Sequence, residues 1–430
     1  MPAPLRSSGR AAGHNGPRPP ARLTVRIRTI TASRRRLTTS SEGCMQLLRR
    51  GDSGPAVREI RATLRELGLL PALSPGTSDR DVFDDEVDHA VRVFQQGRGL
   101  ITDGIVGPDT ARALREAGWS LGDRMLSFTL STPTNGDDVA TLQERLLELG
   151  YNPGRPSGLF DQQTEQALMR FQRDYGMVPD GMCGPETLRA LRQLGRKVTG
   201  GRPHLLREQE LLRRAGPRMR GKRIVIDPGH GGPDRGVEVA GVTEADLMWD
   251  LARRLVGRMS ATGMEALLSR PENGNPPDTE RAQFANDVGA DLVVSLHTDA
   301  SFSPHAQGLA TYFFGNGSGT TSNVGEALAG LVQRELLTRT SMLDCRSQTC
   351  TWELVRRTRM PAVRIETGYL THLGDRRKLL DPGFRDVVAE GILVAVKRLY
   401  LLGQDDQPTG TFTFNDVLAR EYGRDQIRAV

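Results

Sequence analysis

Two histidines each follow a short apolar run, and histidine is a side chain that can bind a metal ion. His230 ends the apolar run RIVIDPGH, which begins at residue 223, and His297 ends the run DLVVSLH, which begins at residue 291. Both runs are short and rich in β-branched residues, so each predicts a strand with a histidine at its carboxyl end. The chain contains only 7 histidines, and two of them share this setting.

Two glutamates extend the set of candidate site residues. Glu244 lies just before the helical pattern LMWDLARRL, and Glu366 ends a third apolar run, AVRIE. Two imidazoles and one carboxylate are a common ligand set for a catalytic zinc, which keeps a fourth position open for water. A further, unligated carboxylate is what such a water needs to lose its proton and later to protonate a leaving group.

The segment 222–400 resembles the catalytic domain of the zinc-dependent N-acetylmuramoyl-L-alanine amidases, the amidase-3 family. The matching stretches follow one another in the family's order: IDPGHGGPDRG, the glutamate of GVTEADL, RAQFAN, SLHTDA and MPAVRIETGYL. The resemblance implies that His230, Glu244 and His297 bind one Zn²⁺ per chain and that Glu366 is the catalytic acid and base. The implied reaction is hydrolysis of the amide between the lactyl group of N-acetylmuramic acid and L-alanine in peptidoglycan.

Two departures from the family pattern lie near these residues. Asp299 stands in SLHTDA where the family usually has asparagine, and Thr371 and His372 stand where serine and asparagine are frequent. Asp299 either adds negative charge near the metal or faces solvent. The predicted metal ligands match the family pattern, so we expect the departures to affect substrate contacts and the turnover rate. Arg281, in RAQFAN, is expected to hold sheet and helix together rather than to bind substrate.

Residues 46–196 contain an internal repeat. The segment 83–110 matches 160–187 at a spacing of 77 residues, and each copy carries three helical patterns with apolar residues at i, i+3, i+4 and i+7. The apolar stripes are interpreted as the core of a small three-helix domain. Both copies resemble peptidoglycan-binding domains of the type 1 family, on the motif D-G-x-x-G-P-x-T and the F-Q helix. The Gly and Asp residues of this motif are expected to build a turn rather than to touch a ligand.

The sequence therefore predicts a multidomain protein, in which two small three-helix peptidoglycan-binding domains precede an α/β amidase domain. Strands alternate with helices in the last domain, which indicates a mostly parallel twisted sheet with its site at the carboxyl ends of the strands. The strands are expected near 223–227, 265–269, 291–297, 308–314 and 362–367. The predicted divisions are a disordered basic leader (1–44), two binding domains (46–118 and 123–196), a linker (197–221), the amidase domain (222–402) and a tail (403–430).

Charge is concentrated in the leader. Its nine arginines and one glutamate give +8, whereas the whole chain has a formal charge of +6, so the remaining residues carry −2. The body shows no basic stripe, which argues against a nucleic-acid partner.

The leader also lacks the apolar core of a secretory signal, and no apolar stretch is long enough to span a membrane. The sequence favours a translation start at Met45 and a cytoplasmic location; the alternative is the cell wall, reached by an unrecognised export route.

The few cysteines agree with a reducing compartment, because they form no dense framework. Cys345 and Cys350 flank a segment predicted as a loop before the last strand. They are expected either to form a disulfide or to remain free thiols. These two cysteines have no histidine nearby at the spacing of a zinc-binding motif, so the sequence does not predict a second zinc site.

The tail suggests a second functional class. Thr409, Thr411 and Thr413 alternate in TGTFTF, which indicates either a strand that pairs with the body or an exposed kinase substrate. Two binding repeats, an amidase domain, no export signal and a threonine-containing tail resemble an actinobacterial subgroup of the family. For that subgroup the resemblance implies a cytosolic regulator of peptidoglycan precursor synthesis with low or no hydrolase activity. Its partners would be a serine/threonine kinase and a cytosolic enzyme of precursor synthesis.

Overall fold

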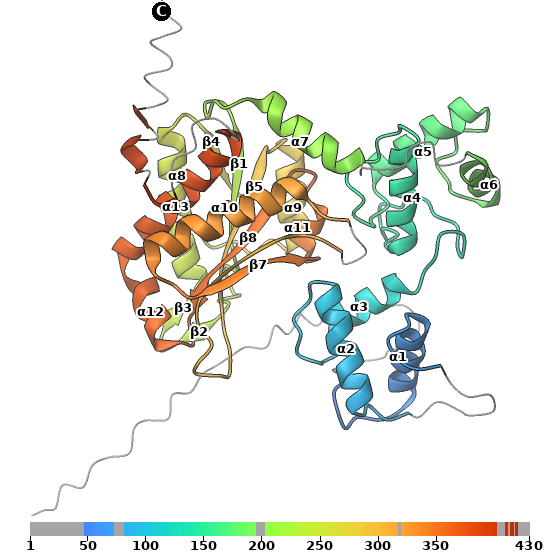
Figure 1. Cartoon of the computed structure of the whole chain (residues 1–430), viewed down its shortest axis with the longest axis horizontal. Helices are drawn as coiled ribbons and strands as arrows, with labels where there is room; N and C mark the ends of the chain where they lie inside the picture. Colours follow the sequence, from blue (N-terminus) through green and yellow to red (C-terminus); the bar gives the residue numbers. More distant parts are fainter. Residues whose placement is uncertain are drawn as a thin grey trace, which may run out of the picture.

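Two small helical bodies precede a larger α/β body in the computed structural model (Figure 1). The structure describes residues 47–72, 81–194, 203–316, 320–401, 409–411, 413–416 and 418–419. Within these ranges, no helix combines the length and the apolar character needed to cross a membrane.

The described part of each repeat has three helices and a core of its own. The first repeat contains α1 (Pro55–Glu66), α2 (Asp85–Gly97) and α3 (Pro108–Ala117), and the second contains α4 (Asp137–Glu148), α5 (Gln162–Tyr175) and α6 (Pro185–Gln193). The side chains of Asp84 and Asp161 accept hydrogen bonds from the first turns of α2 and α5, and α3 and α6 each begin with proline. Buried Phe83 and Phe160 belong to two separate apolar clusters.

The glutamine of each F-Q helix holds the turn that the repeat motif forms. Gln95 Nε2 donates to Asp103 Oδ1 at 2.8 Å, and its Oε1 accepts from the backbone of Gly104 at 2.9 Å. Gln172 makes the same contacts with Asp180 and Gly181. The motif therefore builds a turn in both copies, because a buried amide saturates its own hydrogen-bonding groups there.

A six-stranded sheet forms the centre of the α/β body, in the order β4-β1-β5-β8-β6-β7. The strands are β1 (Arg223–Pro228), β4 (Glu265–Leu268), β5 (Leu292–Asp299), β6 (Leu309–Phe314), β7 (Asp344–Cys350) and β8 (Ala362–Tyr369). The strands β4, β1, β5 and β8 are parallel, whereas β6 runs antiparallel to β8 and parallel to β7. A short hairpin of β2 (Glu238–Val239) and β3 (Val242–Thr243) lies outside this sheet. The predicted combination of helical repeats and a mostly parallel sheet is thus confirmed.

The reversal at β6 has a simple cause. No helix lies between β5 and β6, and a parallel neighbour requires a crossover of about a dozen residues or more. The strand β6 therefore begins at the same end of the sheet at which β5 ends, and it runs in the opposite direction.

The predicted loop between Cys345 and Cys350 is wrong, because these residues form the edge strand β7. The composition does not identify this strand, since its 7 residues are mainly polar and only Cys350 is buried. Both cysteines are free thiols, which decides between the two states expected from the sequence.

Helices cover both faces of the sheet. One face packs on α8 (Glu244–Ala261), α10 (Asn323–Thr340) and α13 (Pro382–Leu401), whose apolar residues share a large buried cluster with the strands. The other face packs on α9 (Asp278–Asp287) and α11 (Glu353–Arg357), around a smaller buried cluster. The short α12 (Leu373–Leu380) follows β8.

The predicted linker contains a helix that the sequence analysis did not identify, α7 (Pro203–Ala215). It lies between the second repeat and the α/β body (Figure 1). The described part of the tail forms no strand: residues 414–416 are helical, and Phe414 packs on the large apolar cluster. Of the two expectations for TGTFTF, the strand is therefore wrong; Phe412 lies outside the described residues.

Candidate metal and catalytic site

The loop after β1 presents His230 in a constrained conformation. The φ angle of His230 is 56°, in the left-handed region that non-glycine residues seldom adopt. Arg281, which is 3% exposed, fixes this loop by donating to the backbone oxygens of Pro228 at 2.8 Å and His230 at 2.9 Å. It also pairs with buried Asp227 at 2.9 Å. Arg281 therefore has the structural role expected of it.

Glu244 is the first residue of α8 and reaches into the sheet. One of its oxygens, Oε2, lies 3.2 Å from His230 Nε2, and the other, Oε1, lies 3.0 Å from His297 Nδ1. Backbone N–H groups of Thr298 and Val237 donate to the same two oxygens at 2.9 and 3.1 Å. The carboxylate is thus fully oriented between the two imidazoles.

Glycines allow the rings to approach the backbone closely. A Cβ on Gly229 would overlap the ring of His297. A Cβ on Gly236 would lie 2.6 Å from Glu244 Oε2, and this glycine also has a left-handed φ of 65°. The glycine-rich stretch around His230 is therefore required by the packing of the donor groups.

The donor atoms of His230, Glu244 and His297 lie within 4.8 Å of one another. Burial, followed by the positive charge of Arg364, lowers the pKa of His297 to about 4, so its imidazole is neutral at pH 7. Burial disfavours the charge of Glu244, but the two histidines and the N–H of Thr298 outweigh it and bring the pKa to about 2. One anionic and one neutral donor thus face the same point, which suits a divalent cation.

Asp234 orients His230, a role that the sequence analysis did not assign. Its Oδ2 lies 2.8 Å from His230 Nδ1, which leaves Nε2 for the cluster. Burial lowers the pKa of His230, but the contacts with Asp234 and Glu244 exceed this effect and raise it. A carboxylate behind a ligating histidine is a regular feature of metal sites. The spacing of four residues from His230 was the only signal in the sequence.

Glu366 lies beside His297 because the two residues are directly paired between β8 and β5. The side chain is 5% exposed, and Arg364 Nε donates to its Oε1 at 2.8 Å. Its Oε2 is buried and has no hydrogen-bond partner among the described residues. Burial raises the pKa of Glu366 to about 7; Arg364 opposes the shift, and Asp299 and Glu244 add to it.

Arg364 is in turn fixed by aromatic side chains. Its guanidinium lies over the Trp352 ring at 4.3 Å, and Trp352 packs on Tyr312 with ring centroids 4.8 Å apart. Arg364 was missed from the sequence, although it precedes Glu366 by two residues and therefore points to the same face of β8.

The departures from the family pattern have separate roles. Asp299 is half-buried, and its negative charge contributes to the raised pKa of Glu366, so it does not simply face solvent. Thr371 accepts a hydrogen bond from the backbone of Ser301 at 3.0 Å, and His372 caps α12. The tail threonine Thr409 accepts a hydrogen bond from Arg398 on α13 at 2.9 Å, whereas Thr411 and Thr413 are exposed, and Thr413 donates to Asp416 at 2.8 Å.

Comparisons with known families cover both parts of the chain. A family model described as N-acetylmuramoyl-L-alanine amidase matches residues 224–398. A model described as a putative peptidoglycan binding domain matches residues 53–114 and 135–191. These matches agree with the two resemblances stated from the sequence.

Two named relatives give the same result. A Mycobacterium tuberculosis protein named N-acetylmuramoyl-L-alanine amidase CwlM is 53% identical over 383 residues, which cover 87% of this chain and 94% of the relative. The Bacillus subtilis amidase LytC is 30% identical over 172 residues, or 40% of this chain and 34% of LytC. A crystal structure of an N-acetylmuramoyl-L-alanine amidase from Clostridium difficile 630 is 29% identical, with a TM-score of 0.40, and covers 43% of this chain and 99% of that one.

Proposed function

Because the chain belongs to the N-acetylmuramoyl-L-alanine amidase family, we propose that its α/β domain hydrolyses the amide between the lactyl group of N-acetylmuramic acid and L-alanine. The substrate would be peptidoglycan or a muramyl-peptide precursor. The observation that carries the proposal is the placement of Glu366 beside His297, at the edge of the cluster formed by His230, Glu244 and His297.

The donor set fits Zn²⁺. Two imidazoles and one carboxylate are ligands that a catalytic zinc uses, and the three donors are close enough to share one ion. Asp234 holds the ring of His230 with Nε2 toward the cluster. When bound, zinc would polarise the scissile carbonyl and make water more acidic.

Glu366 would act as the base and then as the acid. Arg364 holds Oε1, so Oε2 is the atom free to accept the proton of the attacking water and to return it to the nitrogen of L-alanine. A pKa of about 7 suits both transfers near neutral pH, because the group then exists in both protonation states. The two helical repeats would hold the enzyme on peptidoglycan.

Metal analysis and product analysis test this proposal together. Purified protein should contain about one zinc per chain and should convert a muramyl peptide into N-acetylmuramic acid and a peptide with a free L-alanine amino terminus. His230→Ala and His297→Ala should lose the metal and the activity. Full zinc occupancy in the double variant would contradict the ligand assignment.

One observation favours a second function, that of a kinase-controlled regulator of peptidoglycan precursor synthesis in the cytoplasm. Thr411 and Thr413 are exposed beyond the last helix of the α/β body. Phosphate on either would add nearly two negative charges, enough to create a docking site for a basic partner surface. The partners would be a serine/threonine kinase and a cytosolic enzyme of precursor synthesis.

Cell-wall synthesis in living cells separates the two functions. If the regulator is correct, replacing Thr409, Thr411 and Thr413 with alanine should change the rate of precursor incorporation more than Glu366→Gln does. The reverse ranking would exclude the regulator and leave the hydrolase.

A further inference from the structure

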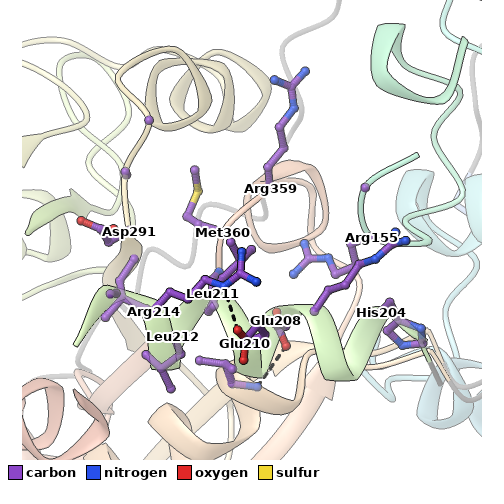
Figure 2. Close-up of a pocket in the computed structure, with 18 of the residues that line it drawn as sticks. Arg155, His204, Glu208, Glu210, Leu211, Leu212, Arg214, Asp291, Arg359 and Met360 are labelled. Carbon is purple, nitrogen blue, oxygen red and sulfur yellow. Dashed lines mark hydrogen bonds and ion pairs between the residues drawn. The ribbon is translucent and has the colours of Figure 1, made fainter. Parts of the chain in front are cut away.

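A cavity of about 830 Å³ lies where three parts of the chain meet. Arg155 belongs to the second repeat, Glu208 and Leu211 to α7, and Met360 to the segment that leads into β8; Figure 2 shows these side chains around the cavity. The volume lies within the range of small-molecule binding sites, and such sites often form between domains.

The cavity is separate from the candidate catalytic site. It opens at the amino ends of β5 and β8, where Leu292 and Pro361 line it. His297 and Glu366 lie toward the carboxyl ends of the same strands. The five residues from Leu292 to His297 correspond to about 16 Å along a strand. A ligand in the cavity would therefore not reach the donor cluster by the same opening.

Positive charge in the cavity is not cancelled by paired carboxylates. Among the described residues, neither Arg155 nor Arg207 forms an ion pair with an acid. Arg207 donates to the side-chain oxygen of Asn152 at 3.0 Å, and the Arg155 guanidinium donates to backbone carbonyls and stacks on Phe314 at 4.2 Å. Burial lowers the pKa of both arginines; Glu208 opposes the shift of Arg155, whose pKa of about 10 keeps it cationic at pH 7.

Arg359 adds a third cation at the rim. Its side chain is 50% exposed and approaches Asp161 only at 3.9 Å, the outer limit of an ion pair. Arg359 also lines a second, smaller cavity of about 370 Å³ beside α5, together with Asn152 and Gln163, which line both cavities. The polar surface therefore continues from one cavity into the next.

The acidic residues around the larger cavity are already engaged. Glu210 forms ion pairs with Arg213 and Arg214 at 2.7 Å. Glu208 accepts a hydrogen bond from the backbone of Val324 at 3.0 Å, at the N-terminus of α10, where the helix dipole favours an anion. Asp291 likewise accepts from a backbone N–H at 2.7 Å. A hydrogen bond from a neutral N–H does not cancel the charge of a carboxylate, and Glu208 also acts on Arg155 through space. Arg155, Arg207 and Arg359 therefore exceed Glu208 and Asp291 by one positive charge.

Apolar side chains complete the lining. Leu206 and Leu211 on α7 are 63% and 69% exposed, which is uncommon for large apolar residues, and both line the cavity with Met360. A ligand with only charge would leave these surfaces in contact with water. The lining therefore suits a molecule that joins an acidic group to a less polar body.

We propose that this cavity binds a small anionic molecule, which carries a carboxylate or a phosphate for Arg155, Arg207 and Arg359 and a less polar body for the leucines of α7. A cell-wall peptide would supply carboxylates, and a sugar nucleotide would supply phosphates. Either ligand would bridge the second repeat and the α/β body, since the three arginines come from both.

Calorimetric titration of the full chain tests this proposal with three probes. Muramyl dipeptide carries a carboxylate, uridine-diphosphate N-acetylglucosamine carries phosphates, and N-acetylglucosamine is the neutral control. We expect at least one anionic probe to bind and the neutral sugar not to bind. Arg207→Met and, independently, Arg359→Met should weaken that binding about tenfold or more, because each removes a charged hydrogen-bond donor.

Arg218→Met is the matched control, since Arg218 is exposed just beyond α7 and does not line the cavity. It should leave the affinity unchanged, and melting temperatures should show that all three variants are folded. Binding of the dipeptide alone, or of the nucleotide alone, would support the proposal and identify the anionic group. Absence of binding by both, or binding that neither cavity variant weakens, would overturn it. Amidase activity is measured separately, so failure of the catalytic proposal would leave this test valid.

Discussion

Glu244 is the residue around which the donor cluster is organised, because its two oxygens contact the two imidazoles separately. The two imidazoles and the backbone N–H of Thr298 lower the pKa of this carboxylate, although its side chain is 1% exposed. Glu366 has the opposite surroundings: one oxygen is held by Arg364, and the other is buried without a partner. Two neighbouring carboxyl groups therefore have pKa values of about 2 and about 7. This difference supports one role in binding a cation and another in transferring protons.

Acid should weaken zinc binding through His230. Asp234 and Glu244 raise the pKa of this histidine above its usual value of about 6.5, and a protonated imidazole cannot bind metal. Zinc affinity should therefore be high at pH 8 and fall as the pH drops through the raised pKa, by up to about tenfold per pH unit for this proton. Competition with a chelator at several pH values measures the effect. An affinity that stays constant from pH 8 to pH 6 would contradict it.

Arg364 should determine the pH at which kcat/KM falls on the acidic side of the activity profile. Its positive charge lowers the pKa of Glu366, so Arg364→Met should raise that pKa above about 7. The base must be ionised in the free enzyme, and the acidic limb of kcat/KM should therefore move to higher pH. Arg253→Met, at an exposed position on α8, should leave the profile in place. A kcat/KM that falls at every pH, with no shift of the acidic limb, would indicate that Arg364 is merely structural.

At the scale of elements, the strands that carry the site were predictable and the edge of the sheet was not. The residues of β1, β5 and β8 are apolar and largely buried, so their composition identifies them. The edge strand β7 is half-exposed and polar, and the direction of β6 depends on a connection without a helix. Asp234, Arg364 and Trp352 were missed for a related reason: their roles come from contacts formed only in the folded chain.

Arg281 anchors the element that presents His230, and its loss should destabilise the fold. Arg281→Met would leave Asp227 buried without its ion pair, which costs about 3–5 kcal/mol in free energy of unfolding. Asp227 has a pKa of about 2, because Arg281 and nearby hydroxyls outweigh burial, so the pair stabilises the fold above the usual pKa of about 3.9. This contribution is lost as the pH falls through 2. Denaturant unfolding of the variant, compared with Arg253→Met, measures the cost; a loss below 1 kcal/mol at pH 7 would contradict the role.

At the scale of the whole molecule, α11 connects both repeats to the α/β body. Arg356 pairs with Glu116 of the first repeat at 2.8 Å and donates to the backbone oxygen of Ser157 in the second at 2.8 Å. The repeats are also joined directly by Arg98 and Asp137 at 2.6 Å. Trp352, the residue before α11, stacks on the guanidinium that holds Glu366. The docking helix and the proposed catalytic carboxylate are therefore in one contact network.

Arg356→Met should loosen the repeats without unfolding any domain. Only the contacts between domains are lost, so the radius of gyration from small-angle scattering should increase while the secondary structure stays constant. Activity on a soluble muramyl peptide should fall less than activity on polymeric peptidoglycan, because only the polymer engages the repeats. Arg115→Met is the control, in the first repeat. An unchanged radius would show that Arg356 does not hold the domains together.

The most direct measurement compares zinc content and product release in wild type and Glu366→Gln, with the exposed variant Glu280→Gln as control. Only proton transfer is removed, so Glu366→Gln should retain about one zinc per chain and lose about 10²–10⁴-fold in the release of free L-alanine amino termini from a muramyl peptide. Glu280→Gln should match wild type in both. Equal turnover by Glu366→Gln, or no turnover by zinc-loaded wild type, would contradict the account.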